Sequence, residues 1–412
     1  MNADARQAEL RQQLHTLGFD EVRFARVAGA APGAEALRAW LAGGLHADMA
    51  WMERTAEKRV QPGLVLPGAQ SVILLGVNYW RDEPRKGKDP SRPVWARYAL
   101  HDDYHDTMKA GLVAAGKAIE KIFGVGHADY RYYVDTGPVL ERGWAARAGL
   151  GFIGKNTMLI SRRFGNWLLL ASILTKWEFT PDAPLTKKSE RRKAENEKDV
   201  GLLCGKCTRC MDECPTGALP RPGVLDARRC ISYQTIENRG IIPREFRPGI
   251  GTRIYGCDIC LDVCPWNRFA RTARSVLLVA RGEIAELPLR ELLELTPARF
   301  AEVFRGTAIK RVKLAGLLRN ACVVAGNSGD PGLLEPLARL AGHASPIVRA
   351  HAVWAVFRLT DSAEKILAAA RAAETEAVVI EEYAWNIQHS TFNAQRPSPI
   401  PNTNDQIPTT NP

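Results

Sequence analysis

A chain of 412 residues is longer than one hydrophobic core usually serves, so its length predicts two or three domains. The composition excludes a wholly disordered or fibrous protein, because 46% of the residues are hydrophobic and 25% are charged, as in ordinary globular proteins. The formal net charge of +11 fits either a polyanionic partner or simple solubility, and composition alone does not decide between the two.

The N-terminal stretch, MNADARQAELRQQLHTLGF, has no apolar core of the kind that secretory signals carry. No other stretch approaches the roughly 20 apolar residues of a membrane span. We therefore expect a cytoplasmic protein that does not contact a membrane. In that reducing compartment the nine cysteines are expected to bind metal rather than to form disulfides.

Residues 1–185 alternate strand-like segments with amphipathic helices. The strand-like segments are 21–27, 71–79, 129–135 and 166–175. The helical segments are 34–44 and 106–123, in which apolar residues recur at intervals of three and four. This alternation predicts an α/β domain.

Asp135 ends the third of these strands and precedes a Gly-Pro turn and a helix. At the carboxyl end of a strand in an α/β sheet, its side chain would face the crevice where ligands bind. Desolvation there would raise the pKa of the carboxyl and suit it to act as a general acid. The alternative is a structural turn or helix cap, which is an equally ordinary place for aspartate.

Other polar residues of this domain could bind a ligand or serve structure alone: Arg59, Arg97, Tyr98, Tyr104 and His105. Gly149, Gly151 and Gly154 form a G-x-G-x-x-G run before Lys155, but a helix precedes the run, whereas a dinucleotide-binding loop follows a strand. A phosphate-binding loop is equally disfavoured, because Asn156 stands where Ser or Thr must bind magnesium. The glycines still allow the backbone to approach a large planar ligand closely.

Eight of the nine cysteines lie within residues 200–270, after a charged stretch at 186–199 that we interpret as a linker or insert. The run CGKCTRCMDECP has the C-x2-C-x2-C-x3-C-P spacing of bacterial ferredoxins, in which the fourth cysteine binds the other cluster. A second run, CDICLDVCP, and a single cysteine between the runs complete the eight that two [4Fe–4S] clusters need. The predicted ligand sets are Cys204, Cys207, Cys210 and Cys264 for one cluster, and Cys214, Cys230, Cys257 and Cys260 for the other.

Two zinc sites are the alternative for these cysteines, although zinc ribbons lack the third cysteine of each run and the following proline. Two clusters conduct electrons, and the long preceding domain suggests an acceptor there.

Beyond residue 285 the sequence is helical, and 330–360 resembles a HEAT repeat of two amphipathic helices. Cys322 lies in an apolar helix and is expected to be a buried structural residue.

Together these segments predict an α+β multidomain protein. Its parts are an α/β domain at 1–185, a charged linker at 186–199, a ferredoxin-like module with two [4Fe–4S] clusters at 200–285, an all-α HEAT-like domain at 286–390 and a disordered tail at 391–412.

The ordered set of motifs resembles the epoxyqueuosine reductases, which are related to reductive dehalogenases. The matching stretches include KRVQPGLVLPG, RYALHDDYHD, VDTGPVLERGWAARAGLGFIGKN, both cysteine runs, CISYQTIENRG and IKRVKLAGLLRNACVVAGN. The resemblance implies a cobalamin-dependent oxidoreductase that removes the epoxide oxygen of epoxyqueuosine at the wobble position of tRNA, the last step of queuosine synthesis. It implies that the first domain binds cobalamin.

The resemblance also implies roles for individual residues. Asp135 matches the proton donor, and the implied cobalamin contacts are Arg59, Tyr98, Asp135, Gly151, Lys155, Ser232 and Glu237. The expected partners are an external low-potential electron donor and the anticodon stem-loop of tRNA. The protein is expected to be a monomer. A basic stripe of Lys310, Arg311, Lys313 and Arg319 is predicted to bind tRNA phosphates.

Two other functions compete with this interpretation. A reductive dehalogenase-like reductase of a small molecule would usually carry a twin-arginine signal, which is absent here. A non-catalytic iron–sulfur electron-transfer protein would lack corrinoid absorption, so the colour of the purified protein distinguishes it.

Overall fold

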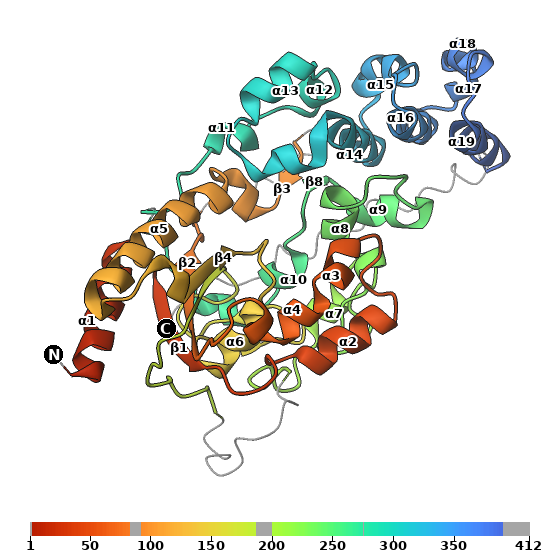
Figure 1. Ribbon diagram of the computed structural model, residues 1–412. Helices are drawn as coiled ribbons and strands as arrows, with labels where there is room; N and C mark the ends of the chain where they lie inside the picture. The colour runs from red at the N-terminus through yellow and green to blue at the C-terminus, as the bar shows by residue number, and fades with distance from the viewer. Residues whose placement is uncertain (1, 83–91, 187–199, 275, 390–412) are drawn as a thin grey trace. The chain divides into compact units, whose positions relative to one another are not determined.

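The computed structural model describes residues 2–82, 92–186, 200–274 and 276–389 (Figure 1). Its contacts divide the chain into two compact units. The first comprises Met1–Glu83, His101–Cys230 and Asp258–Arg281, and the second comprises Pro84–Leu100, Ile231–Cys257 and Gly282–Pro412. Each unit is built from three separated ranges of the chain, so the units do not correspond one to one to the consecutive domains expected from the sequence. Those domain boundaries stay a prediction. The expected linker beyond residue 186 and the expected tail at 391–412 lie outside the described residues.

The first unit contains a four-stranded sheet with the order β1-β2-β7-β4. Its strands are β1 (Glu21–Arg26), β2 (Ser71–Asn78), β7 (Leu168–Thr175) and β4 (Tyr130–Val134), at the four positions predicted. All neighbouring strands are antiparallel, so the predicted α/β domain is corrected to an α+β arrangement. Alternation of helix and strand along a sequence does not fix strand direction, which depends on how each connection returns to the sheet.

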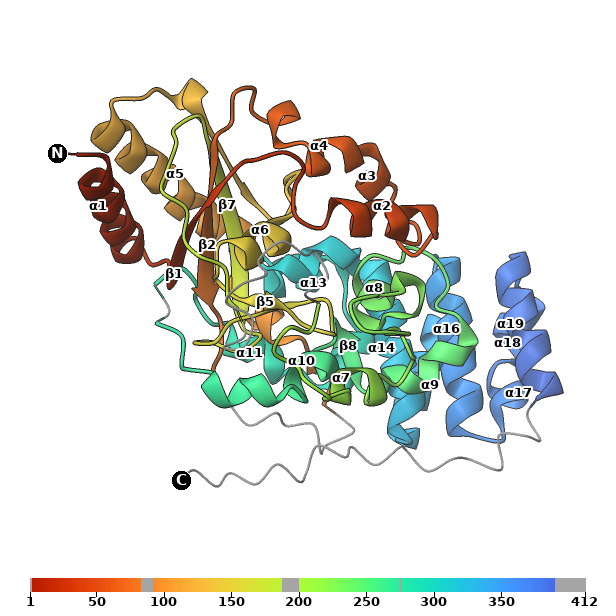
Figure 2. The same cartoon turned by 90° about the horizontal axis from the view of Figure 1, so that it is seen from below.

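Helices cover both faces of this sheet, which explains why every residue of β2 is buried. On one side, α1 (Ala3–Thr16) packs against α5 (Tyr104–Phe123), and α6 (Glu141–Arg147) lies on the other side (Figure 2). Trp144 of α6 is fully buried in a core that includes Val72, Leu74 and Leu174. The segment between β4 and α6, which contains Asp135, is therefore anchored at both ends.

The remaining elements of the first unit are short. They are α2 (Ala34–Ala42), α3 (Ala50–Arg54), α4 (Ala56–Val60), η1 (Pro62–Leu64), η3 (His127–Asp129), β5 (Phe152–Ile153), β6 (Leu159–Ile160), α7 (Arg209–Asp212), η4 (Ala227–Arg229), α10 (Ile259–Asp262) and η6 (Pro265–Phe269). Each cysteine run contributes one helical turn, α7 or α10, and these two turns contact each other. Metal ligation is expected to replace the apolar core in such a region.

The second unit is helical apart from two short parallel strands, β3 (Val94–Trp95) and β8 (Arg253–Tyr255). Its helices are η2 (Arg97–Leu100), α8 (Ile231–Ile236), η5 (Arg244–Phe246), α9 (Arg247–Ile250), α11 (Gly282–Ala285), α12 (Leu289–Leu293), α13 (Pro297–Val303), η7 (Ala308–Val312), α14 (Lys313–Ser328), η8 (Pro331–Leu333), α15 (Leu334–Leu340), α16 (Pro346–Leu359), α17 (Ala363–Ile366), α18 (Ala368–Ala372) and α19 (Ala377–Gln388). The helices predicted beyond residue 285 are confirmed, and α16 packs on α14, α15 and α19. Within the described ranges of both units, no helix is long and apolar enough to cross a bilayer.

Candidate functional site

Four cysteines line one cavity of the first unit, with a volume of about 260 Å³. They are the set predicted to share a cluster: Cys204, Cys207, Cys210 and Cys264. Their thiols are free of disulfides. In the described part of the chain, no three His, Cys, Asp or Glu side chains converge closely enough to hold a single metal ion. The four thiols line one cavity, as the ligands of a cubane cluster would.

Burial of the cavity thiols opposes their ionisation in the absence of a metal. Burial, followed by the neighbouring thiols, raises the pKa of Cys210 to about 11. Burial likewise raises the pKa values of Cys204 and Cys264. Without a metal these thiols stay protonated at neutral pH, and bound iron would supply the charge that stabilises the thiolates.

Lys155 lies beside this cavity and holds the backbone of the first cysteine run. Its Nζ donates hydrogen bonds to the carbonyl oxygens of Gly205, at 2.8 Å, and Cys207, at 2.9 Å. Gly151 is needed by the β5–β6 hairpin itself, because a Cβ atom there would lie 2.5 Å from the carbonyl oxygen of Ile160. The structure therefore places both residues in the support of the cysteine loop, and their contact with cobalamin stays a prediction.

An asparagine with no predicted structural role supports the second cysteine run. The amide of Asn156 donates to the carbonyl oxygen of Cys260 at 3.2 Å and to Oδ1 of Asn166, also at 3.2 Å. Asn156 is almost fully buried. The feature that excluded a magnesium-binding loop is therefore the feature that fastens α10.

The other four cysteines are divided between the units. Cys214, Cys230 and Cys260 belong to the first, and Cys257 ends a segment of the second. The backbone N–H of Ala218 donates to Sγ of Cys214 at 3.3 Å, a contact that would stabilise a ligating thiolate. Their grouping around a second cluster stays a prediction.

Asp135 directly follows β4, at the edge of the antiparallel sheet, with a left-handed φ of 53°. Aspartate tolerates that conformation better than most residues, but it is uncommon and often found at functional positions. The side chain is 66% exposed. Its Oδ2 atom accepts a hydrogen bond of 2.8 Å from the Tyr104 hydroxyl and lies 3.6 Å from Nε2 of His105. The structure thus brings three of the predicted candidates together.

The charge state of this group differs from the sequence prediction. Burial would lower the pKa of His105, but its hydrogen bond to Asp103 and the charge of Asp135 raise that pKa to about 9. Desolvation would raise the pKa of Asp135, but His105, Tyr104 and the positive charge of Arg142 lower it overall. The prediction of a neutral, buried Asp135 is wrong for this conformation, because a cationic histidine 30 residues earlier in the chain stabilises the carboxylate.

A carboxylic acid kept neutral by burial does occur nearby, at Glu141 in the first turn of α6. Burial raises the pKa of Glu141 to about 8, and its Oε1 atom has no hydrogen-bond partner among the described residues. Sequence reasoning missed this residue, although the apolar Val139 and Leu140 before it hinted at burial.

Arg59 is a buried neighbour of the same loop. Its Nε donates to Oγ1 of Thr55 at 3.0 Å, and one terminal nitrogen donates to the carbonyl oxygen of Val139 at 3.3 Å. Its guanidinium also lies 5.5 Å from the centroid of the Trp51 ring. Arg59 therefore supports the loop that carries Asp135, and its predicted contact with cobalamin is untested.

Three of the predicted cobalamin contacts belong to the second unit. Tyr98 is half-buried near Tyr255, with 6.4 Å between ring centroids. Ser232 is half-buried in α8. Glu237 accepts two hydrogen bonds from Arg311, at 2.8 and 3.0 Å. Glu237 thus has a partner that the sequence did not suggest, and the contact of all three with cobalamin stays a prediction.

The predicted phosphate-binding stripe needs one correction. Lys310, Arg311 and Lys313 are exposed, but Arg319 is fully buried on α14. Its guanidinium donates to the carbonyl oxygen of Asn238 at 2.7 Å, and also to those of Gly240 and Gln234. Arg319 cannot reach a phosphate from this position, because its side chain is fully buried and its guanidinium is bonded to backbone carbonyls.

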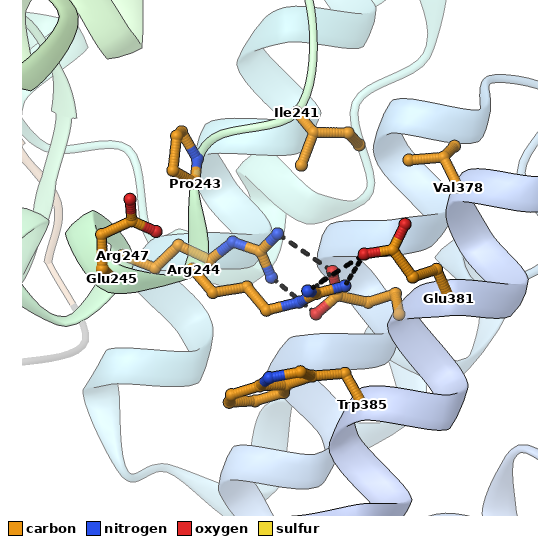
Figure 3. Close-up of a pocket in the computed structure, with 9 residues that line it drawn as sticks. Ile241, Pro243, Arg244, Glu245, Arg247, Val378, Glu381 and Trp385 are labelled. Carbon is orange, nitrogen blue, oxygen red and sulfur yellow. Dashed lines mark hydrogen bonds and ion pairs between the residues drawn. The ribbon is translucent and has the colours of Figure 1, made fainter.

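A larger cavity, of about 490 Å³, lies in the second unit beside η5 and α19. Arg244 and Arg247 point across it toward the carboxylates of α19, and Trp385 lies below them (Figure 3). Arg247 donates to Glu382 at 2.8 and 3.1 Å. The arginines of this cavity are already neutralised, so it is not suited to bind a polyanion.

Comparisons with known proteins agree with the motifs. Residues 59–136 match a family model described as "Epoxyqueuosine reductase QueG, DUF1730", and residues 203–267 match a "4Fe-4S double cluster binding domain". The epoxyqueuosine reductase of Vibrio cholerae is 37% identical over 84% of this chain and 90% of its own length.

Solved structures give the same result. A crystal structure of epoxyqueuosine reductase with an epoxyqueuosine-modified tRNA-Tyr stem loop has a TM-score of 0.82 and 29% identity, over 95% of this chain and all of its own. An epoxyqueuosine reductase structure from Bacillus subtilis, whose aspartate catalytic loop is swung out of the active site, has a TM-score of 0.79 and 29% identity, over 94% and 99% of the two chains.

Proposed function

The chain belongs to the epoxyqueuosine reductase family, and from that premise we propose that it reduces epoxyqueuosine to queuosine at the wobble position of tRNA. The observation that carries the proposal is the pairing of a four-cysteine cavity with the Asp135 loop in one folded unit, in a chain that matches the family over most of its length. The tRNA substrate also supports the expected cytoplasmic location.

The reaction takes two electrons and two protons, because the epoxide oxygen leaves as water and an alkene remains. Thiolates of the two cysteine runs would hold two [4Fe–4S] clusters, which accept electrons from an external low-potential donor. Asp135, mostly exposed and on a loop, would deliver a proton to the oxygen of the opened ring.

Cobalamin is the further cofactor that we propose. When bound, it would supply the strongly reducing centre that attacks the strained ring. One buried polar atom near Asp135, Oε1 of Glu141, has no hydrogen-bond partner in the described part of the chain. Such an atom fits a ligand with polar edges, and a peripheral amide of a corrinoid could satisfy it.

The second unit would hold the tRNA. Its stacked helix pairs, α14 with α16 and α16 with α19, support the HEAT-like interpretation. The exposed Lys310, Arg311 and Lys313 would contact phosphates of the anticodon stem-loop. The modified base would leave the loop stack to reach the reducing centre, as enzymes that act on bases require.

The test is a single-turnover reaction under anaerobic conditions, with iron–sulfur-loaded protein, cobalamin, a strong reductant and epoxyqueuosine-containing tRNA. The nucleoside should lose the mass of one oxygen, and Asp135→Asn should slow that loss by about 10²- to 10⁴-fold. Asp129→Asn, at the end of η3 just before β4, is the matched control and should react like the parent. An unchanged nucleoside mass with the parent protein would reject the function.

A further inference from the structure

Asp135 shares its Oδ2 atom with two side chains from the start of α5. The Tyr104 hydroxyl donates to it at 2.8 Å, and Nε2 of His105 lies 3.6 Å away. Nε2 is buried and has no hydrogen-bond partner among the described residues. A shift of about 0.5 Å would complete a hydrogen bond between the ring and the carboxylate.

The orientation of the His105 ring is fixed from its other side. Asp103, the N-cap of α5, accepts the backbone N–H of His105 at 3.0 Å, and the same Oδ1 atom lies 2.8 Å from Nδ1 of the ring. The ring also stacks on Tyr104, with 4.1 Å between centroids. A carboxylate at Nδ1 selects the N–H form of that nitrogen and leaves Nε2 to exchange a proton with Asp135.

The chemistry of the proposed function, on which this inference rests, needs two protons in succession. The first goes to the ring oxygen when one C–O bond breaks, and the second releases that oxygen as water when the other C–O bond breaks. The two electrons come from the external donor. A single carboxyl group carries one proton at a time, so Asp135 must be recharged between the two transfers.

We propose that His105 is the proton reservoir that recharges Asp135. The proton moves from Nε2 of His105 to Oδ2 of Asp135, and Asp135 passes it on to the substrate oxygen. His105 then takes a new proton from solvent, which reaches the site through the exposed side of the Asp135 loop. His105 acts on the substrate through Asp135 and is therefore a positioning and proton-supplying residue.

The charges around the pair support this assignment. Despite its burial, the pKa of His105 is raised to about 9, while that of Asp135 is lowered, so the shared proton lies on the ring at neutral pH. The charged groups that act on Asp135 from the other elements are Arg142 and Glu141 of α6 and Arg59 of α4. Glu141, whose pKa is raised to about 8, is the competing proton source.

The experiment is the pH profile of the single-turnover rate with reduced holoenzyme. The parent rate should be flat up to about pH 9, because His105 remains protonated to that point. In His105→Gln, the proton must be taken directly from solvent by a carboxyl of low pKa, so the rate should fall about tenfold for each pH unit between about 6 and 8. Added imidazole should restore part of the rate, which a purely structural role would not predict.

Three further variants make the result decisive. His127→Gln, in η3 and bonded to Tyr130 rather than to Asp135, is the matched control and should keep the parent profile. Asp103→Asn keeps the imidazole but removes its anchoring carboxylate, so its rate should begin to fall below about pH 9. The pH profile of Glu141→Gln should stay flat, like that of the parent. A sloping profile in Glu141→Gln together with a flat profile in His105→Gln would overturn the proposal in favour of Glu141.

A readout independent of turnover follows the charge of the ring itself. Diethyl pyrocarbonate modifies neutral imidazole, and peptide mass spectrometry reports the modified residue. His105 should resist modification until about pH 9 in the parent and react at lower pH in Asp103→Asn. If His105→Gln fails to load iron, Asp103→Asn carries both tests. Identical pH profiles would reject the proposal alone, whereas a parent that leaves epoxyqueuosine unchanged would reject the function.

Discussion

The two units each contain a carboxylate paired with a cation, and they use the pair in opposite ways. In the first, Asp135 is 66% exposed and faces a histidine at 3.6 Å. In the second, Glu382 is 1% exposed and pairs at 2.8 Å with Arg247, which is fully buried. Histidine can release its proton near neutral pH, whereas arginine cannot. Access to water and a titratable partner make one pair suited to proton transfer, and their absence makes the other a fixed structural element.

The largest expected effect breaks the buried pair. Glu382→Gln leaves the charge of Arg247 without a counterion in the core, which typically costs about 3–5 kcal/mol. For a unit of this size, each kcal/mol lowers Tm by about 2–4 °C, so we expect a fall of at least about 6 °C in a thermal scan.

Glu381→Gln is the matched control on the same helix. The Glu381 side chain is 71% exposed and lies 3.4 Å from Arg244, so its loss should cost less than about 1 kcal/mol. Equal Tm values for the two variants would show that burial does not distinguish the pairs, and the contrast between the units would fail.

A smaller effect separates the pairs by their response to pH. The pKa of His105 is raised from 6.5 to about 9 on folding, so its pairing stabilises the fold fully below about pH 6.5 and is lost as the pH rises through about 9. The lowered pKa of Asp135 makes stability depend on pH only below about 3.8, so the contribution of Asp135 is constant in this window. The Tm advantage of the parent over His105→Gln should therefore shrink between about pH 6 and about pH 9.5.

The magnitude of this change is at most about 3 kcal/mol, because one pKa unit corresponds to about 1.4 kcal/mol and the ring is partly exposed. The difference between the parent and Glu382→Gln should stay constant over the same range. A His105 contribution that does not change with pH would show that the ring is not charged in the folded protein.

The sequence predicted the local features of both units and missed those that depend on distant neighbours. The four strands, the C-terminal helices and the grouping of Cys204, Cys207, Cys210 and Cys264 follow from patterns within a few residues, or from a ligand spacing with a known geometry. Strand direction has no such local signal, and neither does the charge of Asp135, which His105 sets from another element.

The burial of charged residues was the other feature that the sequence did not predict. Arg319 was assigned to a basic surface stripe because it follows Lys310, Arg311 and Lys313 at short spacing. In the structure all residues of α14 from Gly316 to Gly326 are buried, so the helix has no exposed face at Arg319. Apolar periodicity shows which face of a helix is buried, but it does not show that a whole helix turn is enclosed on every side.

The smallest expected effect concerns exposed cations of the second unit, Lys310 and Arg311. Lys310→Ala with Arg311→Ala should weaken binding of the tRNA stem-loop by about tenfold, which equals about 1.4 kcal/mol. The slope of log affinity against log salt should fall by about 1 to 2, with the lower value favoured because Glu237 already neutralises part of the Arg311 charge.

Arg319→Lys is the control: loss of its hydrogen bonds to three backbone carbonyls should lower Tm, but the affinity of the folded protein for tRNA should not change. A double variant that binds as tightly as the parent at the same salt would exclude this surface from tRNA contact, whereas weaker binding by Arg319→Lys at unchanged Tm would return Arg319 to it.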